Sequence, residues 1–266
     1  MGQGDQPVLL DIGEDAIARI RLNRPDASNG MNVELLQALH NAILRCHGDP
    51  AVRVVVLSGE GRHFCAGGDV RTFAAQGEGL PDYLREATAW LQLATSALIQ
   101  LQPPVIAQVH GFAAGGGGFG LVCAADLVVA AESARFFSGA VRVGMAPDAG
   151  TTVTLTQLVG LRRAMQILLT NPTLTAARAC DLGVVTEVVP DSLLAARVGE
   201  LAAELAASSP LALAATKRLV WGGVGAGVHE RLPEEARTVS ELSGTADARE
   251  GLAAVIERRP PKFSGR

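Results

Sequence analysis

Two glycine-rich loops have the composition best suited to catalysis in this sequence. The first runs from His63 to Asp69 (HFCAGGD) and the second from Gly111 to Gly118 (GFAAGGGG), and each follows an apolar segment expected to be a strand. Because glycine has no side chain, the backbone N–H groups of two such loops can approach and hydrogen-bond a single substrate oxygen. This arrangement is an oxyanion hole, in which each donor contributes about 3–4 kcal/mol of transition-state stabilisation in well-studied enzymes.

Asp148, in the segment MAPDAG, is a carboxylate that could move protons beside such a hole. Burial against apolar neighbours such as Phe137, Val143 and Met145 would raise the pKa of this carboxyl into a range useful for acid–base catalysis. The other interpretation is structural, because an aspartate just before a helix expected to start near Ala149 is a common N-cap. The two roles are compatible.

Other chemistries have weaker support. Gly115, Gly117 and Gly120 satisfy the G-x-G-x-x-G pattern of dinucleotide-binding sites, but the acidic residue that this pattern needs about twenty residues further on is missing, since Asp126 comes too early. The neighbouring cysteines and histidines match no zinc-ligand spacing, and no G-x-S-x-G pentapeptide of a serine hydrolase occurs. We therefore expect neither a metal site nor a redox cofactor.

The segments around these loops predict an α/β core that positions them. Apolar or alternating runs indicate strands at residues 8–12, 16–22, 52–58, 105–109 and 127–130. Apolar residues at helical spacing indicate one helix that follows an N-cap at Asn32 and another over residues 81–101. Strand, glycine loop and helix recur with short connections, which is typical of α/β proteins built from stacked units.

Beyond residue 150 the sequence is mainly helical and rich in alanine and leucine. We expect helices at residues 161–170, 175–181, 191–208, 210–221 and 233–258, with one strand at 184–189. No low-complexity linker separates the two parts. We divide the chain into a core of residues 1–200 and a C-terminal helical region of residues 201–266, whose helices pack either on a partner subunit or on their own core.

Composition excludes several classes of protein. The 266 residues are 48% apolar, which is enough for a substantial core, and 23 Lys and Arg against 27 Asp and Glu give a net charge of −4. That balance leaves no basic surplus for nucleic acid, and no uninterrupted apolar stretch suits a membrane helix. The four cysteines show no CxxC spacing, which is typical of reduced thiols in the cytoplasm. We therefore expect a cytoplasmic protein that binds neither nucleic acid nor membranes.

Six segments spread over nearly the whole chain resemble the enoyl-CoA hydratase/isomerase (crotonase) superfamily, in that family's order and spacing. They are LNRPDASNGMN, HFCAGGDV, PPVIAQVHGFAAGGGGFGLVCAADLVVAAESARF, GMAPDAGTT, LGVVTEVV and RRPPKFSGR. The resemblance implies an α/β spiral of ββα turns with a C-terminal helical trimerisation region, assembled as a homotrimer or homohexamer. It also implies acyl-CoA substrates whose thioester carbonyl becomes an enolate, and no metal or redox cofactor, since coenzyme A is part of the substrate.

The resemblance assigns the two oxyanion donors. The residue before the Asp of CAGGD supplies the first N–H, and that residue is Gly68. The second donor comes from the middle of the glycine run, which has one more glycine here than the family pattern. Counting forward from Gly111 gives Gly116, whereas counting back from Asp126 gives Gly117. We favour Gly116 and keep Gly117 beside it.

The resemblance also implies contacts with coenzyme A. The backbone at Ala27 and Ser28 and the segment from Ala66 to Arg71 resemble the family's adenine and pantetheine contacts; in the latter the candidate residues are Ala66, Asp69, Val70 and Arg71. Lys262 and Phe263 resemble C-terminal contacts that are often made to the ligand of a neighbouring subunit. A solvated lysine in the C-terminal tail is the alternative interpretation of Lys262.

The acid–base residues distinguish the reactions of this family. Hydratases hold the attacking water with two glutamates, and the matching positions here are Phe119 or Gly120 and Ala140. Without these carboxylates, the addition of water lacks its usual general base and acid. Asp148 instead resembles the P-D-x-G element of double-bond isomerases, including those of the phenylacetate-pathway type. The resemblance therefore implies an enoyl-CoA isomerase in which Asp148 moves a proton between two carbons.

Three alternatives stay open. One is an enoyl-CoA hydratase or related lyase that uses another carboxylate, such as Asp69 or Glu86. Another is a paralogue that binds CoA esters without turnover. Residues 159–189 also resemble 4-chlorobenzoyl-CoA dehalogenases, in which an aspartate at the position of Asp148 is the nucleophile. Those enzymes also need a His and a Trp, and because the matching positions here are Gln92 and Ala140, aromatic displacement is unsupported.

Overall fold

A computed structural model describes residues 6–266 of the chain. Its core is a six-stranded sheet with the strand order β1-β2-β3-β4-β6-β9. The strands are β1 (Val8–Ile12), β2 (Ile17–Leu22), β3 (Val54–Gly59), β4 (Val105–Val109), β6 (Leu127–Ala131) and β9 (Glu187–Val189). β1 and β2 form the expected antiparallel hairpin, and every other neighbouring pair is parallel. The α/β prediction is therefore confirmed.

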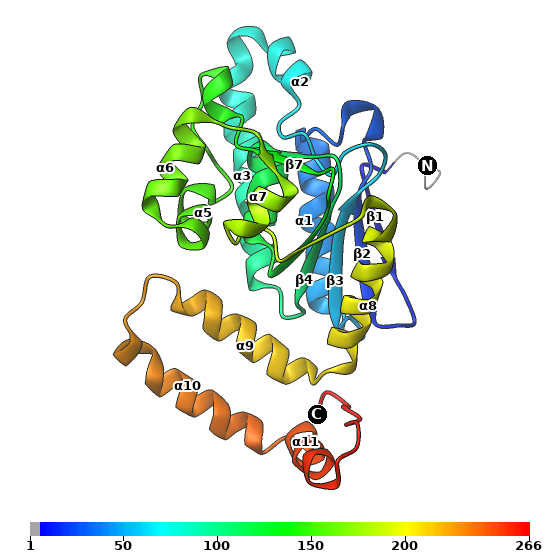
Figure 1. Cartoon of the computed structure of the whole chain (residues 1–266). Helices are drawn as coiled ribbons and strands as arrows, with labels where there is room; N and C mark the ends of the chain where they lie inside the picture. Colours follow the sequence, from blue (N-terminus) through cyan, green and yellow to red (C-terminus); the bar gives the residue numbers. More distant parts are fainter. Residues whose placement is uncertain (1–5) are drawn as a thin grey trace.

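Helices cover both faces of this sheet (Figure 1). α1 (Val33–Gly48) and α3 (Leu80–Gln100) pack together on one face, and α8 (Leu194–Ala207) packs on the other. The first four residues of β3 are all apolar because the strand is covered on both faces. Leu57 belongs to the core under α1 and α3, whereas Val56 belongs to the core under α8. Successive strand side chains point to opposite faces, so a strand covered on both sides must be apolar at every position.

The structure also contains a smaller three-stranded sheet that the sequence did not predict. It consists of β5 (Phe112–Ala114), β7 (Arg135–Phe137) and β8 (Leu174–Thr175). Two short helices, α4 (Leu121–Ala124) and α7 (Ala176–Asp181), lead from this sheet back to core strands. α5 (Thr151–Val159) and α6 (Leu161–Thr170) lie between β7 and β8, and α2 (Val70–Ala75) lies between β3 and α3. Of these elements, α2 and β7 contribute to the walls of the site described below.

The C-terminal helices extend away from the sheet as an arm (Figure 1). The arm comprises α9 (Pro210–Gly223), α10 (Val228–Ser243) and α11 (Ala246–Glu257). The prediction of one helix over residues 233–258 is wrong, because α10 ends before Gly244 and Thr245 caps a new helix by accepting a hydrogen bond from the Ala248 N–H at 3.0 Å. The expected division after residue 200 lies inside α8.

Two features of the arm bear on how it packs. Lys217 on α9 is buried, and its Nζ lies 2.7 Å from Asp126 Oδ2, which anchors α9 to the core. Further along, Val239, Val255 and Ile256 are 67%, 79% and 80% exposed. The arm is therefore attached to its own core at one helix and leaves apolar side chains uncovered on the others.

The four cysteines are all free. Within residues 6–266, no helix combines the length and the apolar character needed to cross a membrane.

Candidate functional site

The structure brings the two glycine loops side by side. The Cys65 N–H donates to the Phe112 carbonyl at 3.0 Å, and the Ala114 N–H donates back to the Cys65 carbonyl at 2.9 Å. On its other side the first loop is fixed by Met31, whose N–H donates to the Gly67 carbonyl at 2.8 Å. Gly67 has a φ of +99°, and a β-carbon at this position would lie 3.1 Å from the Ala114 carbonyl oxygen. Glycine therefore allows the loops to approach this closely.

Both favoured oxyanion donors have free N–H groups. Gly68 ends the first loop, and Gly116 is the first residue of a π-helical turn over Gly116–Gly120. The first N–H groups of a helix have no acceptor within it. In the described part of the chain, the amides of Gly68 and Gly116 donate to no protein acceptor. Gly117 is buried, a β-carbon at this position would meet Met31 and Cys65, and Gly117 also lines the cavity described next.

The loops open into a cavity of about 570 Å³, within the size range of small-molecule sites. Its walls are largely apolar and come from α1, α2, α3 and the segment that follows β7. They include Leu36, Phe73, Leu84, Ala87, Leu91, Phe137, Val143 and Met145. Such a lining suits an acyl group, because burying apolar surface is favourable and adds no unpaired polar atoms.

Asp148 projects into this cavity beside Gly116. Burial raises the pKa of its carboxyl above the ordinary value, as expected from the sequence. The expectation that its side chain caps a helix near Ala149 is wrong. α5 begins at Thr151 with Gly150 as its N-cap, and Asp148 contributes only its backbone carbonyl, which accepts from the Thr151 N–H at 3.0 Å. The Asp148 carboxylate therefore remains available for chemistry.

The other two candidate carboxylates are placed differently. Asp69 caps α2, accepting from the Thr72 N–H at 3.1 Å, and its carboxylate lies 3.0 Å from the Arg24 guanidinium. Burial alone would raise the pKa of Asp69, but these hydrogen bonds and the Arg24 charge hold it below the usual value. Glu86 is exposed and does not line the cavity. Among residues 6–266, Asp148 is the only acidic residue that lines the cavity.

The residues at the positions of the missing hydratase and dehalogenase side chains also have clear places. Phe119 is fully buried in the core, and Gly120 is buried beside it. Ala140 lines the cavity, so an apolar methyl stands where a second carboxylate would lie. Gln92 is exposed on α3 and is not part of the cavity wall.

The candidate CoA contacts divide into two groups. The Ala66 N–H donates to the Ser28 carbonyl at 3.0 Å, so Ala27 and Ser28 adjoin the segment that continues through Asp69, Val70 and Arg71. Ala66 and Val70 line the cavity, and the Arg71 side chain is exposed on the first turn of α2. Two members of this group therefore line the cavity, and the other four adjoin them along the chain or through this hydrogen bond.

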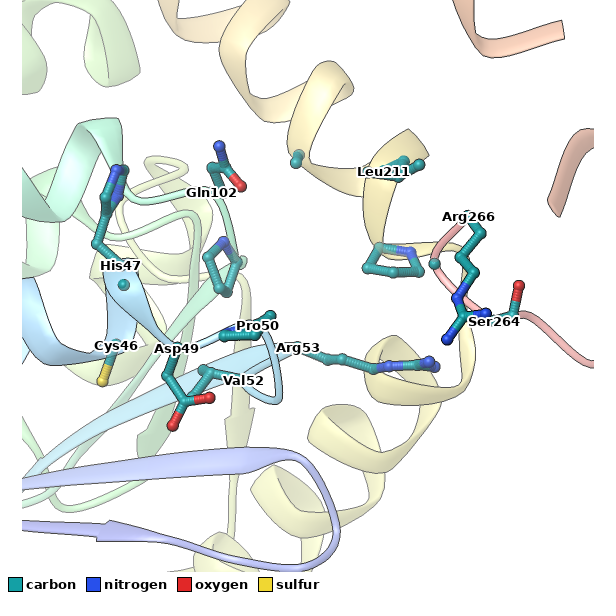
Figure 2. Close-up of a pocket in the computed structure, with 15 residues that line it drawn as sticks. Cys46, His47, Asp49, Pro50, Val52, Arg53, Gln102, Leu211, Ser264 and Arg266 are labelled. Atoms are coloured by element: carbon teal, nitrogen blue, oxygen red, sulfur yellow. The ribbon is translucent and has the colours of Figure 1, made fainter. Parts of the chain in front are cut away.

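Lys262 and Phe263 do not belong to that group within one chain. The Lys262 N–H donates to Glu250 Oε1 on α11 at 2.8 Å, and the Phe263 carbonyl accepts from Arg53 at 3.4 Å. Close to this tail lies a second cavity of about 480 Å³ between the core and the C-terminus, with Arg53 and Arg266 in its lining (Figure 2). None of the candidate catalytic residues lines this second cavity.

Sequence reasoning missed Arg142, which lines the cavity, and Asn171, which contacts the Arg142 side chain. Arg142 lies on a short 3-10 turn (Ala140–Val143) and lines the cavity. Asn171 is 3% exposed, and its side-chain Oδ1 accepts from the Gly139 N–H at 3.0 Å. The one local signal was the Asn171-Pro172 pair after an apolar helix, which marks a helix end but does not show what the asparagine contacts.

Comparison with known proteins gives a consistent result. The model of the enoyl-CoA hydratase/isomerase family matches residues 13–266. A Rhodobacter capsulatus protein named "Probable enoyl-CoA hydratase" is 39% identical, with 97% of this chain and 98% of that protein aligned. The 1,2-epoxyphenylacetyl-CoA isomerase of Escherichia coli is 32% identical, with 97% and 98% aligned. A solved enoyl-CoA hydratase from Bacillus anthracis superposes with a TM-score of 0.92 at 31% identity, covering 98% of this chain and 100% of that one.

Proposed function

Because this chain belongs to the enoyl-CoA hydratase/isomerase family, we propose that it is an enoyl-CoA double-bond isomerase with Asp148 as its single acid–base residue. The observation that carries this proposal is the position of Asp148, which is the only acidic residue lining the cavity within residues 6–266 and lies against Gly116. A carboxyl with a raised pKa is a stronger base once ionised than an ordinary aspartate, and a proton shuttle needs a group that both accepts and returns a proton.

In the proposed reaction, the thioester oxygen of a 3-enoyl-CoA accepts hydrogen bonds from the N–H groups of Gly68 and Gly116. The Asp148 carboxylate removes a proton from C2, and the resulting negative charge spreads over C2, C4 and the oxygen that the two N–H groups stabilise. The protonated Asp148 then delivers the proton to C4. The double bond moves from C3–C4 to C2–C3, with no net change in protons or electrons. The proposed reaction thus needs no metal or redox cofactor.

Hydration is the second candidate, and the name of the Rhodobacter capsulatus relative favours it. Syn addition of water uses one group to activate the water and one to protonate C2. The buried Phe119 and the methyl group of Ala140 supply neither, and the Asp69 carboxylate is engaged by Arg24 and Thr72. These contacts are the reason for placing isomerisation first.

The proposal extends to coenzyme A and to assembly. Members of this family bind acyl-CoA and are typically oligomeric. We place the adenine and pantetheine at Ala27, Ser28 and the Ala66–Arg71 segment, and we assign Lys262 and Phe263 to the ligand of a neighbouring subunit in a homotrimer or homohexamer. Uncovered apolar side chains on α10 and α11 support a subunit contact there. The four free cysteines support a cytoplasmic location.

The test is to incubate the purified protein with a 3-enoyl-CoA in D₂O and to follow the absorbance of the conjugated thioester together with deuterium uptake. We expect both signals in the native protein and a loss of about 10²–10⁴-fold in Asp148→Asn. A protein that binds CoA esters but shows neither signal would be a binding paralogue or would act on another acyl group. Formation of a 3-hydroxyacyl-CoA from a 2-enoyl-CoA at a comparable rate would replace the proposal with hydration.

A further inference from the structure

Arg142 is the only basic residue that lines the cavity within residues 6–266. It lies on the 3-10 turn Ala140–Val143, between Ala140 and the apolar side chains of Val143 and Met145. Arg142 is exposed at the edge of this cavity, and neither the proposed proton transfer nor the oxyanion hole uses it.

Two contacts hold the Arg142 guanidinium in place. One of its terminal NH₂ groups donates to the Asn171 carbonyl at 2.7 Å, and its central carbon lies 5.3 Å from the centre of the Phe137 ring. Asn171 is buried at the end of α6, and its side chain also fixes the Gly139 N–H at 3.0 Å. The guanidinium is therefore positioned on the wall, and most of its N–H groups remain unused.

Arg142 has no acidic partner. None of the ion pairs within residues 6–266 includes it, so no carboxylate of that part of the chain lies within 4.0 Å of its nitrogens. Asp148 lines the same cavity, yet burial raises the pKa of that carboxyl and no contribution from Arg142 opposes it. A close guanidinium would have lowered that pKa. Arg142 therefore does not serve the base.

The position of Arg142 relative to the proposed site indicates which part of a substrate it faces. In the proposed function, on which this step rests, coenzyme A occupies the Ala66–Arg71 surface and the thioester carbonyl lies between Gly68 and Gly116. The wall that remains for the acyl group includes Phe137, Val143 and Arg142. We assign this wall to the part of the acyl group beyond the reacting carbons, which would bring that part next to Arg142.

We propose that Arg142 is a specificity residue that binds an anionic oxygen at the far end of the acyl group, so that the preferred substrates are CoA monothioesters of dicarboxylic acids. The guanidinium offers paired N–H groups that match the two oxygens of a carboxylate. Phe137 and Val143 beside it fit the methylene chain that joins the carboxylate to the thioester. With an uncharged acyl end, the guanidinium keeps only solvent and the Asn171 carbonyl as hydrogen-bond partners.

A purely structural role would also explain the contact with Asn171. A cation near the last carbonyls of α6 stabilises the end of that helix, and this contact alone requires no ligand. The two explanations differ in what they predict for binding. A helix-capping arginine affects stability and all ligands alike, whereas a specificity residue separates carboxyl-ended from methyl-ended acyl groups.

The experiment measures dissociation constants by calorimetry with saturated esters, which cannot be isomerised. Glutaryl-, adipoyl- and suberoyl-CoA are compared with pentanoyl-, hexanoyl- and octanoyl-CoA in the native protein, in Arg142→Gln and in Arg142→Lys. Arg163→Gln, an exposed change on α6, is the matched control. We expect at least one carboxyl-ended ester to bind the native protein about tenfold or more tightly than its methyl-ended counterpart. Arg142→Gln should abolish this preference and leave the methyl-ended esters within about twofold.

The outcomes separate this inference from the proposed function. Equal or tighter binding of the methyl-ended ester at every chain length in the native protein would overturn it. An equal loss for both series in Arg142→Gln would overturn it too, because it would place a CoA phosphate on Arg142. If Arg142→Gln does not fold, Arg142→Lys should keep a weaker preference, since lysine retains the charge without the paired geometry. If the native protein prefers carboxyl-ended esters but has no isomerase activity, the proposed function is refuted and the role of Arg142 in specificity stands.

Discussion

The α-carbon of Gly116 lies directly against the carboxylate of Asp148, so closely that a methyl group at position 116 would overlap the carboxylate oxygen. Gly116 is also the first residue of the π-helical turn and has a free N–H group. One glycine therefore brings the proposed oxyanion donor and the proposed base together. A substrate whose carbonyl is bound at Gly116 must hold its neighbouring carbons beside Asp148.

Gly116→Ala should consequently displace the base. The added methyl group forces the Asp148 carboxylate away, and a shift of about 1 Å in a catalytic group lowers rates about 100-fold. We expect kcat for isomerisation to fall by about this factor while CoA esters still bind. Gly199→Ala is the matched control, because Gly199 is exposed on α8 with open space around it, and alanine there should add about 0.5–1 kcal/mol of stability.

The stability of Gly116→Ala offers an independent check on the contact. Overpacking typically costs about 1–3 kcal/mol, and the clash partner here is the Asp148 side chain. In an Asp148→Ala background that partner is gone, so the same glycine change should cost much less. Additive effects of the two substitutions in urea unfolding would show that the side chains do not touch in solution.

Asp148→Asn should abolish activity and yet make the protein more stable near neutral pH. Burial raises the pKa of this carboxyl in the folded chain, so the folded state binds the proton more tightly than the unfolded state. The stabilising contribution is complete below the unfolded pKa, near the ordinary value of 3.8, and is lost as pH rises through the folded pKa. The uncharged amide of asparagine does not titrate, so Asp148→Asn does not lose this stability as the pH rises. Thermal unfolding should therefore show a larger gain for Asp148→Asn at pH 8 than at pH 5, and a gain that did not change with pH would contradict this assignment.

The isomerase rate should depend on pH through the same group. Removal of the C2 proton requires ionised Asp148, so kcat/KM should fall on the acidic side as the carboxylate becomes protonated. Because burial raises its pKa, the midpoint of this fall should lie above 3.8. The profile of kcat/KM for a 3-enoyl-CoA measures it directly. A midpoint at or below 3.8 would assign the titration to a solvated carboxyl instead.

Long elements with one clear burial pattern could be predicted from the sequence. β4 and α6 have the predicted bounds. α6 spans enough turns for its helical period to be recognised, and β4 is a short apolar run interrupted only by Gln108. β5, β7 and β8 span two or three residues, too short to show a period, and their pairing depends on segments far apart in the chain. The predicted start of α10, at residue 233, is too late. Proline favours the first turn of a helix, whereas Pro233 lies inside α10, which begins at Val228.

In the candidate site, too, some residues could be predicted from local sequence and others could not. The two glycine loops and Asp148 were predicted because their residue types are unusual in themselves. Arg142 was not, because its position depends on Asn171, which is 29 residues away, and on a ring contact with Phe137. Asp148 was also expected to cap a helix, and the glycine at position 150, with a φ of +72°, takes that place instead. Contacts between distant segments, rather than local propensity, decide these points.

The link between the arm and the core includes a buried lysine whose contribution can be tested. Lys217 Nζ lies 2.7 Å from Asp126 Oδ2 and donates to the carbonyls of Leu98 and Pro103 at 3.2 Å each. Burial lowers the pKa of Lys217, and the Asp126 charge opposes that shift. Lys217→Met leaves the carboxylate of Asp126, whose side chain is 16% exposed, with only the N–H groups of Val105 and Trp221, so we expect a loss of about 3 kcal/mol in urea unfolding.

Two further variants show whether that loss comes from the unpaired charge. Lys217→Met combined with Asp126→Asn should recover much of the stability, because the amide needs no cation. Arg218→Gln, next to Lys217 on α9, removes an exposed pair with Glu234 and should cost less than about 1 kcal/mol. If Lys217→Met and Arg218→Gln had the same small effect, the arm would be held by its apolar contacts rather than by the buried ion pair. Since Asp126 also accepts from the Val105 N–H at the start of β4, a large effect would extend from the arm into the central sheet.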